Sequence, residues 1–421
     1  MKQINHRFDV PETMKRKKTN LDIFNDETVS GVVFKNRSLK KFIISHINQS
    51  GNSTITELSK DLGTSVPKTT SLINELIQDG LIQDEGKLDS TGGRRASMFG
   101  LVPDACYFLG VDVKKFHINF GLMDFTKKMI YQKEKVPFRL ENTPESLENL
   151  IQLIKSFLGE GPSSKAQILG IGINLTGRIN HKTGHSFSFF HFKEEPLAQI
   201  IQNEIGIPTF LENDSRAMAY GEFQSNELKK ENNILFINMD YGMGMGILLD
   251  GKVYYGKSGF SGEFGHIPLF ENEILCHCGK KGCLETEASG HALVRKFKEQ
   301  IKKGLTSTAL KKNMPIDEIT MNDIINAALN EDQLSIELIS EIGEKLGKGL
   351  ALLVNIFNPE ILILGGALSE TGDYIRLPAR STLNKLSLSL VNNDTKLKIS
   401  QLGEKAGVIG ACLTARDTII L

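Results

Sequence analysis

Three cysteines and a histidine gather in one short stretch of the sequence. Cys276, Cys278 and Cys283 lie within eight residues, and His266 stands ten residues before the first of them. Three thiolates and an imidazole form a complete tetrahedral ligand set for zinc. The alternative is three reduced cysteines beside a chance histidine, but the whole chain has only five cysteines in 421 residues. Four protein ligands leave no open position for water, so the expected zinc is structural.

Two acids flank these predicted ligands. Glu263 lies three residues before His266, and Glu285 lies two residues after Cys283. A metal would fix the loop that carries both carboxylates. Carboxylates held at fixed positions suit a ligand with several hydroxyl groups, because each can accept hydrogen bonds from neighbouring hydroxyls.

Composition narrows the class of protein. Charged residues make up 24% and hydrophobic residues 40% of the chain, and the formal net charge is zero. These values are ordinary for a globular protein of two or three domains. No apolar run is long enough to span a bilayer, and no apolar segment follows the charged N-terminus as in a secretory signal. The few cysteines fit a reducing compartment, so we expect a cytoplasmic protein without membrane contact.

The N-terminal hundred residues have the pattern of a DNA-binding domain. Residues 1–36, with a basic run at 15–18, are expected to form a flexible arm with a short helix around 20–33. Residues 37–101 are expected to form a winged helix-turn-helix. Its first helix is indicated by apolar residues at helical spacing, namely Leu39, Phe42, Ile43 and Ile47. Thr56 is expected to cap a second helix, and Ser65 a third that has Pro67 in its first turn.

The third helix has one apolar face and one small, polar face. A recognition helix contacts base edges in the major groove through its N-terminal residues. We therefore expect DNA contacts from Pro67, Lys68, Thr70 and Ser71. Two strand-like runs then surround the sequence STGGRR, which predicts a β-wing with Arg94 and Arg95 at its tip. The alternative for this stretch is a small helical bundle or a protein-binding winged helix.

From residue 106 onward, apolar strand-like runs alternate with helical runs. Strand-like runs at 107–136 and again at 233–255 predict two three-stranded meanders, each leading into helix–strand units. Residues 361–365 are expected as the final buried strand. The repeated scheme predicts two similarly built α/β lobes with a cleft between them, approximately 102–225 with a C-terminal helix, and 226–405.

These features occur in an order typical of a known family. The motifs in chain order are STGGRR, TGRIN at 176–180, END at 212–214, DYGMGMG at 240–246, GEFGH at 262–266, CHCGKKGCLE at 276–285 and NPEILILGG at 358–366. This order resembles the ROK family of repressors, open reading frames and sugar kinases. The resemblance covers roughly residues 38–420. It points to the family's winged-helix transcriptional regulators, similar to repressors of the N-acetylglucosamine and xylose types, and implies a two-lobed, actin-like sugar-kinase fold at 102–421.

The resemblance also implies which residues bind sugar. In the family, the Asn-Asp pair binds sugar hydroxyls and the aspartate is the base in kinases, which maps onto Asn213 and Asp214. The acids and histidine of the other motifs map onto Glu263, His266 and Glu285, with His266 shared with zinc. TGRIN resembles the sugar loop of the family's N-acetylhexosamine kinases and adds two further residues, Gly177 and Arg178. The alternative for Asn213-Asp214 is a helix cap, and both roles are compatible.

The sequence departs from the family's kinases where they hold ATP. The family's first phosphate loop has the pattern DxGGTK, whereas this chain has Asp112-Val113-Lys114-Lys115-Phe116. Without glycine the backbone cannot approach a phosphate closely. In the second loop Met243 stands where the kinases have threonine. The resemblance therefore implies a body that binds sugar and has lost phosphoryl transfer, with Asp214 a catalytic base only if kinase activity remains.

The leading hypothesis is that the protein is a sugar-responsive transcriptional regulator, and the favoured form of this hypothesis is a repressor of a carbohydrate-utilisation operon. Its expected partners are operator DNA and a sugar or sugar phosphate, and it is expected to be a homodimer or homotetramer. One alternative is an ATP-dependent hexose or N-acetylhexosamine kinase with a DNA-binding domain. Another is a constitutive DNA-binding protein whose body serves only for dimerisation.

Overall fold

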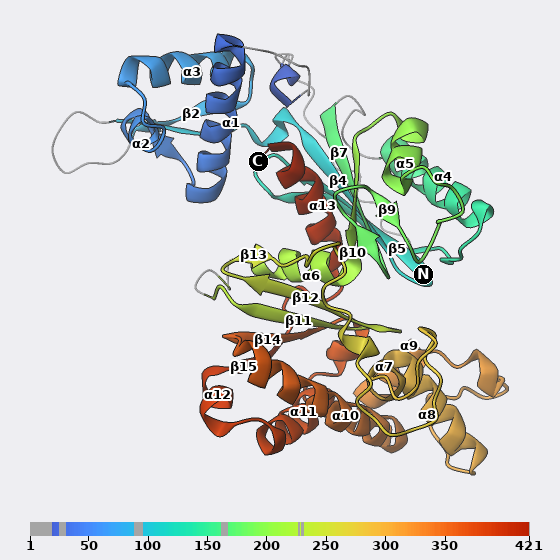
Figure 1. The fold of residues 1–421 in the computed structure, drawn as a ribbon. Coiled ribbons are helices and arrows are strands. Elements are labelled where there is room, and N and C mark those ends of the chain that lie inside the picture. The colour runs from blue at the N-terminus through green and yellow to red at the C-terminus, as the bar shows by residue number, and fades with distance from the viewer. Residues whose placement is uncertain are drawn as a thin grey trace. The chain divides into compact units, whose positions relative to one another are not determined.

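The structure is a computed structural model that describes residues 19–24, 31–87, 96–160, 167–225, 228 and 231–420 (Figure 1). The basic run at 15–18 and the predicted wing-tip residues Arg94 and Arg95 lie outside these residues. The chain divides into two compact units. The first comprises Met1–Cys106, Asp124–Thr126 and Thr418–Leu421, and the second comprises Tyr107–Met123 and Lys127–Asp417.

The first unit contains the predicted helices and wing strands. Its helices are α1 (Val32–Ser50), α2 (Ile55–Asp61) and α3 (Val66–Gln78). A small sheet has the order β1-β3-β2, formed by β1 (Ser53–Thr54), β2 (Ile82–Lys87) and β3 (Ser97–Leu101). The helices enclose a common apolar core that includes Ile43, Ile47, Leu58, Leu72, Ile73 and Leu76. This is the architecture of a winged helix-turn-helix.

Local details of the first unit differ from the sequence prediction. Helix α1 begins at Val32, inside the stretch predicted as a flexible arm, and the described part of the predicted 20–33 helix contains a short 3-10 helix at Asp22–Phe24. The cap of α2 is Thr54 rather than Thr56, because Thr54 and Glu57 form a capping box. Ser65 caps α3 as predicted, with its hydroxyl accepting from the Lys68 N–H.

The second unit contains two five-stranded sheets, each built from a meander and later strands. The first has the order β10-β7-β4-β5-β6, and the second β13-β12-β11-β14-β15. The first sheet contains β4 (Tyr107–Val113), β5 (His117–Asp124), β6 (Met129–Pro137), β7 (Ile168–Leu175) and β10 (Thr209–Asn213). The second contains β11 (Ile234–Met239), β12 (Met243–Leu249), β13 (Lys252–Val253), β14 (Ile361–Gly365) and β15 (Lys396–Ile399). Residues 361–365 form a fully buried strand as predicted, but a further, partly exposed strand follows, because β15 pairs in parallel with β14.

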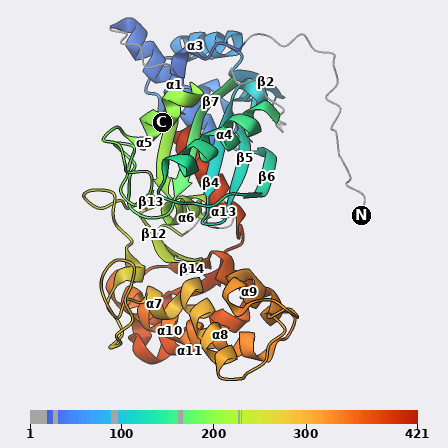
Figure 2. The ribbon, with the colours of Figure 1, turned by 90° about the vertical axis from the view of Figure 1, so that its right-hand side faces the viewer.

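Helices cover both sheets. Against the first sheet pack α4 (Pro144–Glu160) and α5 (Leu197–Ile205), sharing a core with its strands. Helix α6 (Asp214–Phe223) packs on β11, β12 and β14 of the second sheet. The other core of that sheet is formed with α8 (Gly290–Lys302), α9 (Met321–Leu329), α10 (Gln333–Phe357) and α11 (Asp373–Leu386). Both views place these helices on one side of the second sheet (Figures 1 and 2).

The C-terminal helix α13 (Lys405–Ile420) returns to the first sheet. A Cβ on Gly110 would lie 2.5 Å from the Val408 carbonyl oxygen, and a Cβ on Gly172 would lie 1.9 Å from the Ala411 carbonyl oxygen. Glycines on β4 and β7 therefore allow the helix backbone to lie directly against the sheet. Within the described residues, no helix is long and apolar enough to cross a membrane.

Candidate functional site

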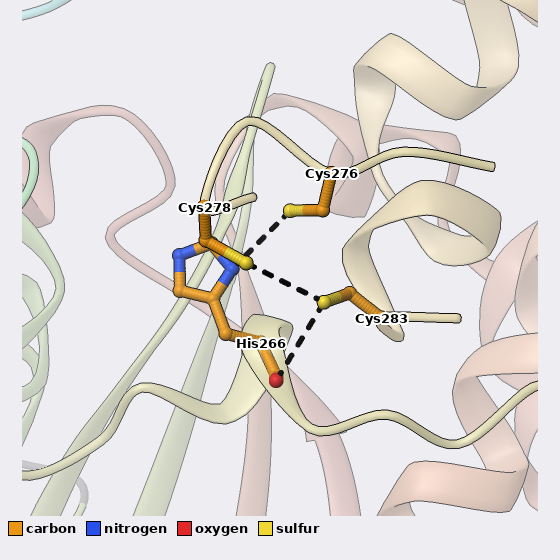
Figure 3. A group of neighbouring side chains, drawn as sticks. All are labelled: His266, Cys276, Cys278 and Cys283. Atoms are coloured by element: carbon orange, nitrogen blue, oxygen red, sulfur yellow. Dashed lines mark hydrogen bonds between the residues drawn. The ribbon is translucent and has the colours of Figure 1, made fainter. Parts of the chain in front are cut away.

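The four predicted metal ligands lie together in the second unit (Figure 3). Their ligand atoms are all within 4.8 Å of one another. The Sγ of Cys276 is 3.5 Å from Nδ1 of His266, and the two Sγ atoms of Cys278 and Cys283 are 3.7 Å apart. Thiolates at about 2.3 Å from a tetrahedral zinc ion are about 3.8 Å apart. The donor set and its spacing therefore fit zinc.

Tight turns bring these ligands together. His266 ends the 3-10 helix η5 (Phe264–His266), and isolated bridges pair Pro268 with Cys283 and Leu275 with Lys281. Gly282 has φ +74°, and a Cβ there would lie 2.1 Å from the Phe270 carbonyl oxygen. Only glycine fits this position, so the loop sequence itself determines the convergence of the ligands.

Glu285 lies beside the cluster and is engaged at both oxygens. It begins helix α7 (Glu285–Ala288) and is 7% exposed. Its Oε2 accepts from the Met243 N–H at 2.9 Å, and its Oε1 is 3.0 Å from Nδ1 of His277. Burial opposes ionisation, but these two partners outweigh it and lower the pKa of Glu285. His277 was not singled out from the sequence, since its neighbours Cys276 and Cys278 dominate the motif.

Asn213 and Asp214 stand where β10 meets helix α6. The Asn213 Oδ1 accepts from the N–H groups of Ser215 and Arg216, so the predicted helix cap is present. The Asn213 Nδ2 also donates to the Gly177 carbonyl oxygen at 2.9 Å, which links the END motif to TGRIN. Asn213 thus caps α6 with its Oδ1 atom and holds the TGRIN loop with its Nδ2 group.

Asp214 is a buried acid. Its side chain accepts from the Ser215 N–H at 2.7 Å and from Asn238 Nδ2 at 3.4 Å. Burial raises the pKa of Asp214 to about 6, with Lys114 opposing the shift and Asp112 adding to it. A carboxyl group that titrates near neutral pH is suited to accept a proton from a hydroxyl.

The TGRIN loop is held by a second short loop. Gly177 has φ +90°, and a Cβ there would lie 2.4 Å from the Ser188 hydroxyl oxygen. That hydroxyl accepts from the Arg178 N–H at 3.0 Å, whereas the Arg178 side chain is exposed. Strands β8 (Ile179–Asn180) and β9 (His185–Ser186) form the hairpin that carries these residues. The structure therefore fixes the backbone of the predicted sugar loop.

Two chains of contacts join the predicted sugar-binding residues. One runs from Gly177 through Asn213 to Asp214. The other joins Glu263, whose Oε2 is 3.8 Å from Nε2 of His266, through the metal cluster to Glu285. These two sets of contacts come together at the first two residues of β12. A Cβ on Gly244 would lie 2.2 Å from the Ser215 hydroxyl oxygen, and the Met243 N–H donates to Glu285.

The segment that corresponds to the first phosphate loop of the family's kinases contains a buried lysine. Lys114 follows β4, its side chain is 9% exposed, and its Nζ is 3.6 Å from Oδ2 of Asp112 and 3.7 Å from Oδ2 of Asp240. Burial alone would lower the pKa of Lys114, but the carboxylates of Asp112, Asp240 and Asp214 outweigh it and raise that pKa. The ammonium group thus links a strand end of the first sheet to one of the second.

Two more residues of the same segment contact the second loop. The Lys115 Nζ lies 3.6 Å above the ring of Tyr241, and the Phe116 ring meets that of Tyr241 edge-on at 5.9 Å. A cation over an aromatic face is attracted to it. The sequence showed that glycines were missing here, but not that Lys114 and Lys115 would pair with Asp240 and Tyr241, because those partners lie more than a hundred residues away.

The predicted DNA contacts lie in the first turns of α3. Pro67 and Ser71 are exposed, and Lys68 and Thr70 are half-buried. The Lys68 Nζ donates to Asn36 Oδ1 at 2.8 Å, and the Thr70 hydroxyl donates to the Val66 carbonyl oxygen. The Ser71 hydroxyl donates to Glu75. Pro67 and Ser71 are therefore the most accessible of the four.

A winged helix-turn-helix followed by two kinase-like lobes defines a class of DNA-binding proteins built on a sugar-kinase body. The chain belongs to the ROK family, which matches residues 108–418, and residues 39–83 match the winged helix-turn-helix DNA-binding domain.

Similar proteins include both regulators and kinases. The xylose repressor of Caldicellulosiruptor bescii is 31% identical over 357 residues, covering 84% of this chain and 89% of that protein. The structure of a ROK family transcriptional regulator, a homologue of the Escherichia coli MLC protein, matches with a TM-score of 0.75 and 27% identity, covering 92% of this chain and 97% of that one. A ROK glucokinase from Streptomyces griseus, solved with glucose and AMPPNP, matches with a TM-score of 0.65 and 28% identity, covering 74% of this chain and 99% of that one.

Proposed function

We propose that this protein is a sugar-responsive, DNA-binding transcriptional repressor of a carbohydrate-utilisation operon. The observation that carries the proposal is the pairing of a winged helix-turn-helix with a ROK body that keeps the sugar motifs and fills its phosphate loops with Lys114 and Phe116. The similarity to a xylose repressor supports the same class. Such a protein works in the cytoplasm, where its operator DNA is.

The proposed effector is a sugar or sugar phosphate bound near Asn213, Asp214, Glu263, His266 and Glu285. Acids and amides in fixed positions grip vicinal hydroxyls, and buried polar groups reject ligands that lack those hydroxyls. Gly177 and Arg178 complete the proposed site, since Asn213 ties their loop to it.

Loss of phosphoryl transfer is supported by the charge inside the former nucleotide site. A kinase there would need to hold Mg²⁺ and phosphates between the loops. In this chain the Lys114 ammonium already lies within 3.7 Å of Asp112 and Asp240. A cation at that position competes with a metal ion for the same carboxylates.

The proposed zinc is held by His266, Cys276, Cys278 and Cys283. It would supply a fixed positive charge that keeps the thiolates together, with no open position for catalysis. Nδ1 of His266 lies on the cysteine side and Nε2 on the Glu263 side. The metal would thereby fix the imidazole edge that faces the ligand.

The proposed response is a change in the spacing of two winged helices. A homodimer, or one pair of subunits in a homotetramer, would place one α3 helix on each half of a palindromic operator. Ligand binding in each body would favour one arrangement of the lobes. A ligand that binds both arrangements equally would shift nothing.

An operator-binding titration by fluorescence anisotropy tests the proposal. We expect one class among pentoses, hexoses, amino sugars and their phosphates to change operator affinity. The same ligand at a hundred times its dissociation constant is expected to stabilise the protein by about 2.7 kcal/mol. If no compound of the panel changes operator affinity, the proposed function is wrong. Affinity for DNA without any ligand-induced stabilisation would instead indicate a constitutive DNA-binding protein.

A sugar kinase is the second candidate, and the environment of Asp214 favours it. An acid whose pKa is raised to about 6 can act as the base for a sugar hydroxyl. A coupled assay of ADP release across the same sugars separates the two candidates. Turnover that is abolished by Asp214→Asn would replace the first proposal with this one.

A further inference from the structure

Arg216 is a buried arginine next to the END motif, and its side chain makes four contacts. It lies in the first turn of α6, two residues after Asp214, and is 2% exposed. Its Nε donates to Glu212 Oε1 at 2.8 Å, its Nη1 to the Gly259 carbonyl oxygen at 2.7 Å, and its Nη2 to the Ile179 carbonyl oxygen at 3.1 Å. The fourth contact is with the Tyr255 ring, 5.5 Å from its guanidinium carbon.

The two carbonyl groups belong to different lobes. Ile179 is in the TGRIN loop, which follows β7 of the first sheet. Gly259 is in the loop that leads from β13 of the second sheet to Gly262 and Glu263. A Cβ on Gly259 would lie 3.1 Å from the Ile179 carbonyl oxygen, so the two loops touch at this point. One guanidinium group therefore fixes the separation of two loops that carry predicted ligand contacts.

Two stacked rings, those of Tyr255 and His181, lie beside this arrangement, whose Glu212 and Arg216 side chains are 4% and 3% exposed. Burial raises the pKa of Tyr255, and its hydrogen bond to Glu212 raises it further, so the phenol stays protonated as a donor. The ring of His181 stacks on that of Tyr255 with centroids 3.7 Å apart. The Glu212–Arg216 pair is thus shielded from water, which strengthens each of its hydrogen bonds.

We propose that Arg216 is a positioning residue of the ligand site. It holds the TGRIN loop and the 254–262 loop at the distance at which Gly177, Arg178 and Glu263 can contact one ligand. The planar fork of arginine can donate to a carboxylate and two carbonyl oxygens at once, whereas lysine has a single donor atom. Preordering two loops lowers the entropic cost of binding. The inference rests on the proposed sugar-binding function for the identity of the ligand.

The test combines loop protection with ligand affinity in the full-length protein. Hydrogen–deuterium exchange is measured by mass spectrometry without ligand for residues 176–190 and 254–263. Arg216→Lys is expected to speed exchange in both segments by about tenfold, and the dissociation constant for the responsive sugar is expected to rise by about tenfold. Operator affinity without sugar is expected to stay unchanged. Arg380→Lys is the matched control, because Arg380 also donates to a backbone carbonyl, that of Thr395, within the second lobe.

A second variant avoids leaving a buried charge unpaired. Glu212→Gln combined with Arg216→Gln removes both charges together and is expected to show the same loss of protection and of sugar affinity. Unchanged exchange of both segments in Arg216→Lys and in the double variant would overturn the inference. If the wild type binds none of the sugars but hydrogen exchange is faster in both segments of both variants, the role of Arg216 in holding the loops is supported and the proposed sugar-responsive function is wrong. If only general stability drops, with sugar affinity retained, Arg216 is merely structural and the inference is wrong.

Discussion

Replacing Lys114 by methionine tests the ion pairs at the segment where the family's kinases hold ATP. Methionine has nearly the length of lysine, and Met218 already lies 3.6 Å from the Nζ atom, so the side chain fits without its charge. The change leaves Asp112, which is fully buried, beside Asp214 and Asp240 without their common cation. Removing one partner of a buried ion pair typically costs about 3–5 kcal/mol. We expect the free energy of unfolding of the second unit to fall by about that amount at neutral pH.

The loss is expected to depend on pH, and the pKa of Asp214 gives its sign. That pKa is already raised by burial from 3.8 to about 6, and Lys114 lowers it. A raised pKa means that the carboxyl group contributes its full stability below the unfolded value and loses it as pH rises through the folded value. Without Lys114 the folded value moves higher, so the loss extends to higher pH. The variant is therefore expected to lose more stability at about pH 8 than at about pH 5.

Urea unfolding followed by far-UV circular dichroism measures this loss, because the chain contains no tryptophan. The matched control is Asp112→Asn combined with Lys114→Met, which removes one carboxylate together with the cation. The double variant is expected to recover at least half of the lost stability. Equal stability of Lys114→Met and the wild type at pH 8 would refute the reasoning, as would a double variant no more stable than the single one.

Three further predictions concern the metal, the DNA contact and a helix cap. Metal analysis is expected to find one zinc per chain. The Cys283→Ser variant is expected to lose this zinc and the sugar response while keeping its operator affinity. A zinc-free wild-type protein with a full sugar response would contradict this prediction. Lys68→Ala is expected to weaken operator binding by about 1–3 kcal/mol and to relax the base preference at one operator position, with sugar affinity unchanged. An unchanged base preference at every operator position would exclude a base contact by Lys68. Ser65→Ala is expected to cost about 1 kcal/mol of stability in the first unit, measured by urea unfolding, since it removes the cap of α3.

Local sequence signals predicted most of the fold because the two meanders and the helix caps are determined by nearby residues. Strand β4 begins at Tyr107, where the first meander was predicted to begin, and Ser65 caps α3. Strand β15 was missed because its sequence, KLKI, is short and half charged, and only its pairing with β14 makes it a strand. The cap of α2 was misplaced by two residues because Thr54 and Thr56 are both suitable caps, and Glu57 decides between them.

The candidate site divides in the same way. The cluster of His266, Cys276, Cys278 and Cys283 was predictable because its members are close in sequence and have distinctive chemistry. The partners of Glu285 and Arg216 were not, since a carboxylate or guanidinium gives no sequence sign of which distant carbonyl or N–H it will meet. Helix α6 also buries Asp214 and Glu222, so charge alone gave no sign that singled out Arg216.

Asp214 connects the proposed ligand site to the segment that corresponds to the first phosphate loop of the family's kinases, where Lys114 stands. Asp112, Asp214 and Asp240 all face Lys114, and in a kinase the cation beside such carboxylates comes with the nucleotide. Under the proposed loss of phosphoryl transfer, the chain would need its own positive charge here, since otherwise the acids would repel one another and take up protons. Lys114 supplies it and opposes the rise in the pKa of Asp214. An ionised Asp214 can accept hydrogen bonds from two sugar hydroxyls through its two oxygens, whereas in a protonated one the O–H oxygen acts as a donor. Lys114 would therefore preserve sugar recognition by the same charge that excludes the metal ion needed for phosphoryl transfer.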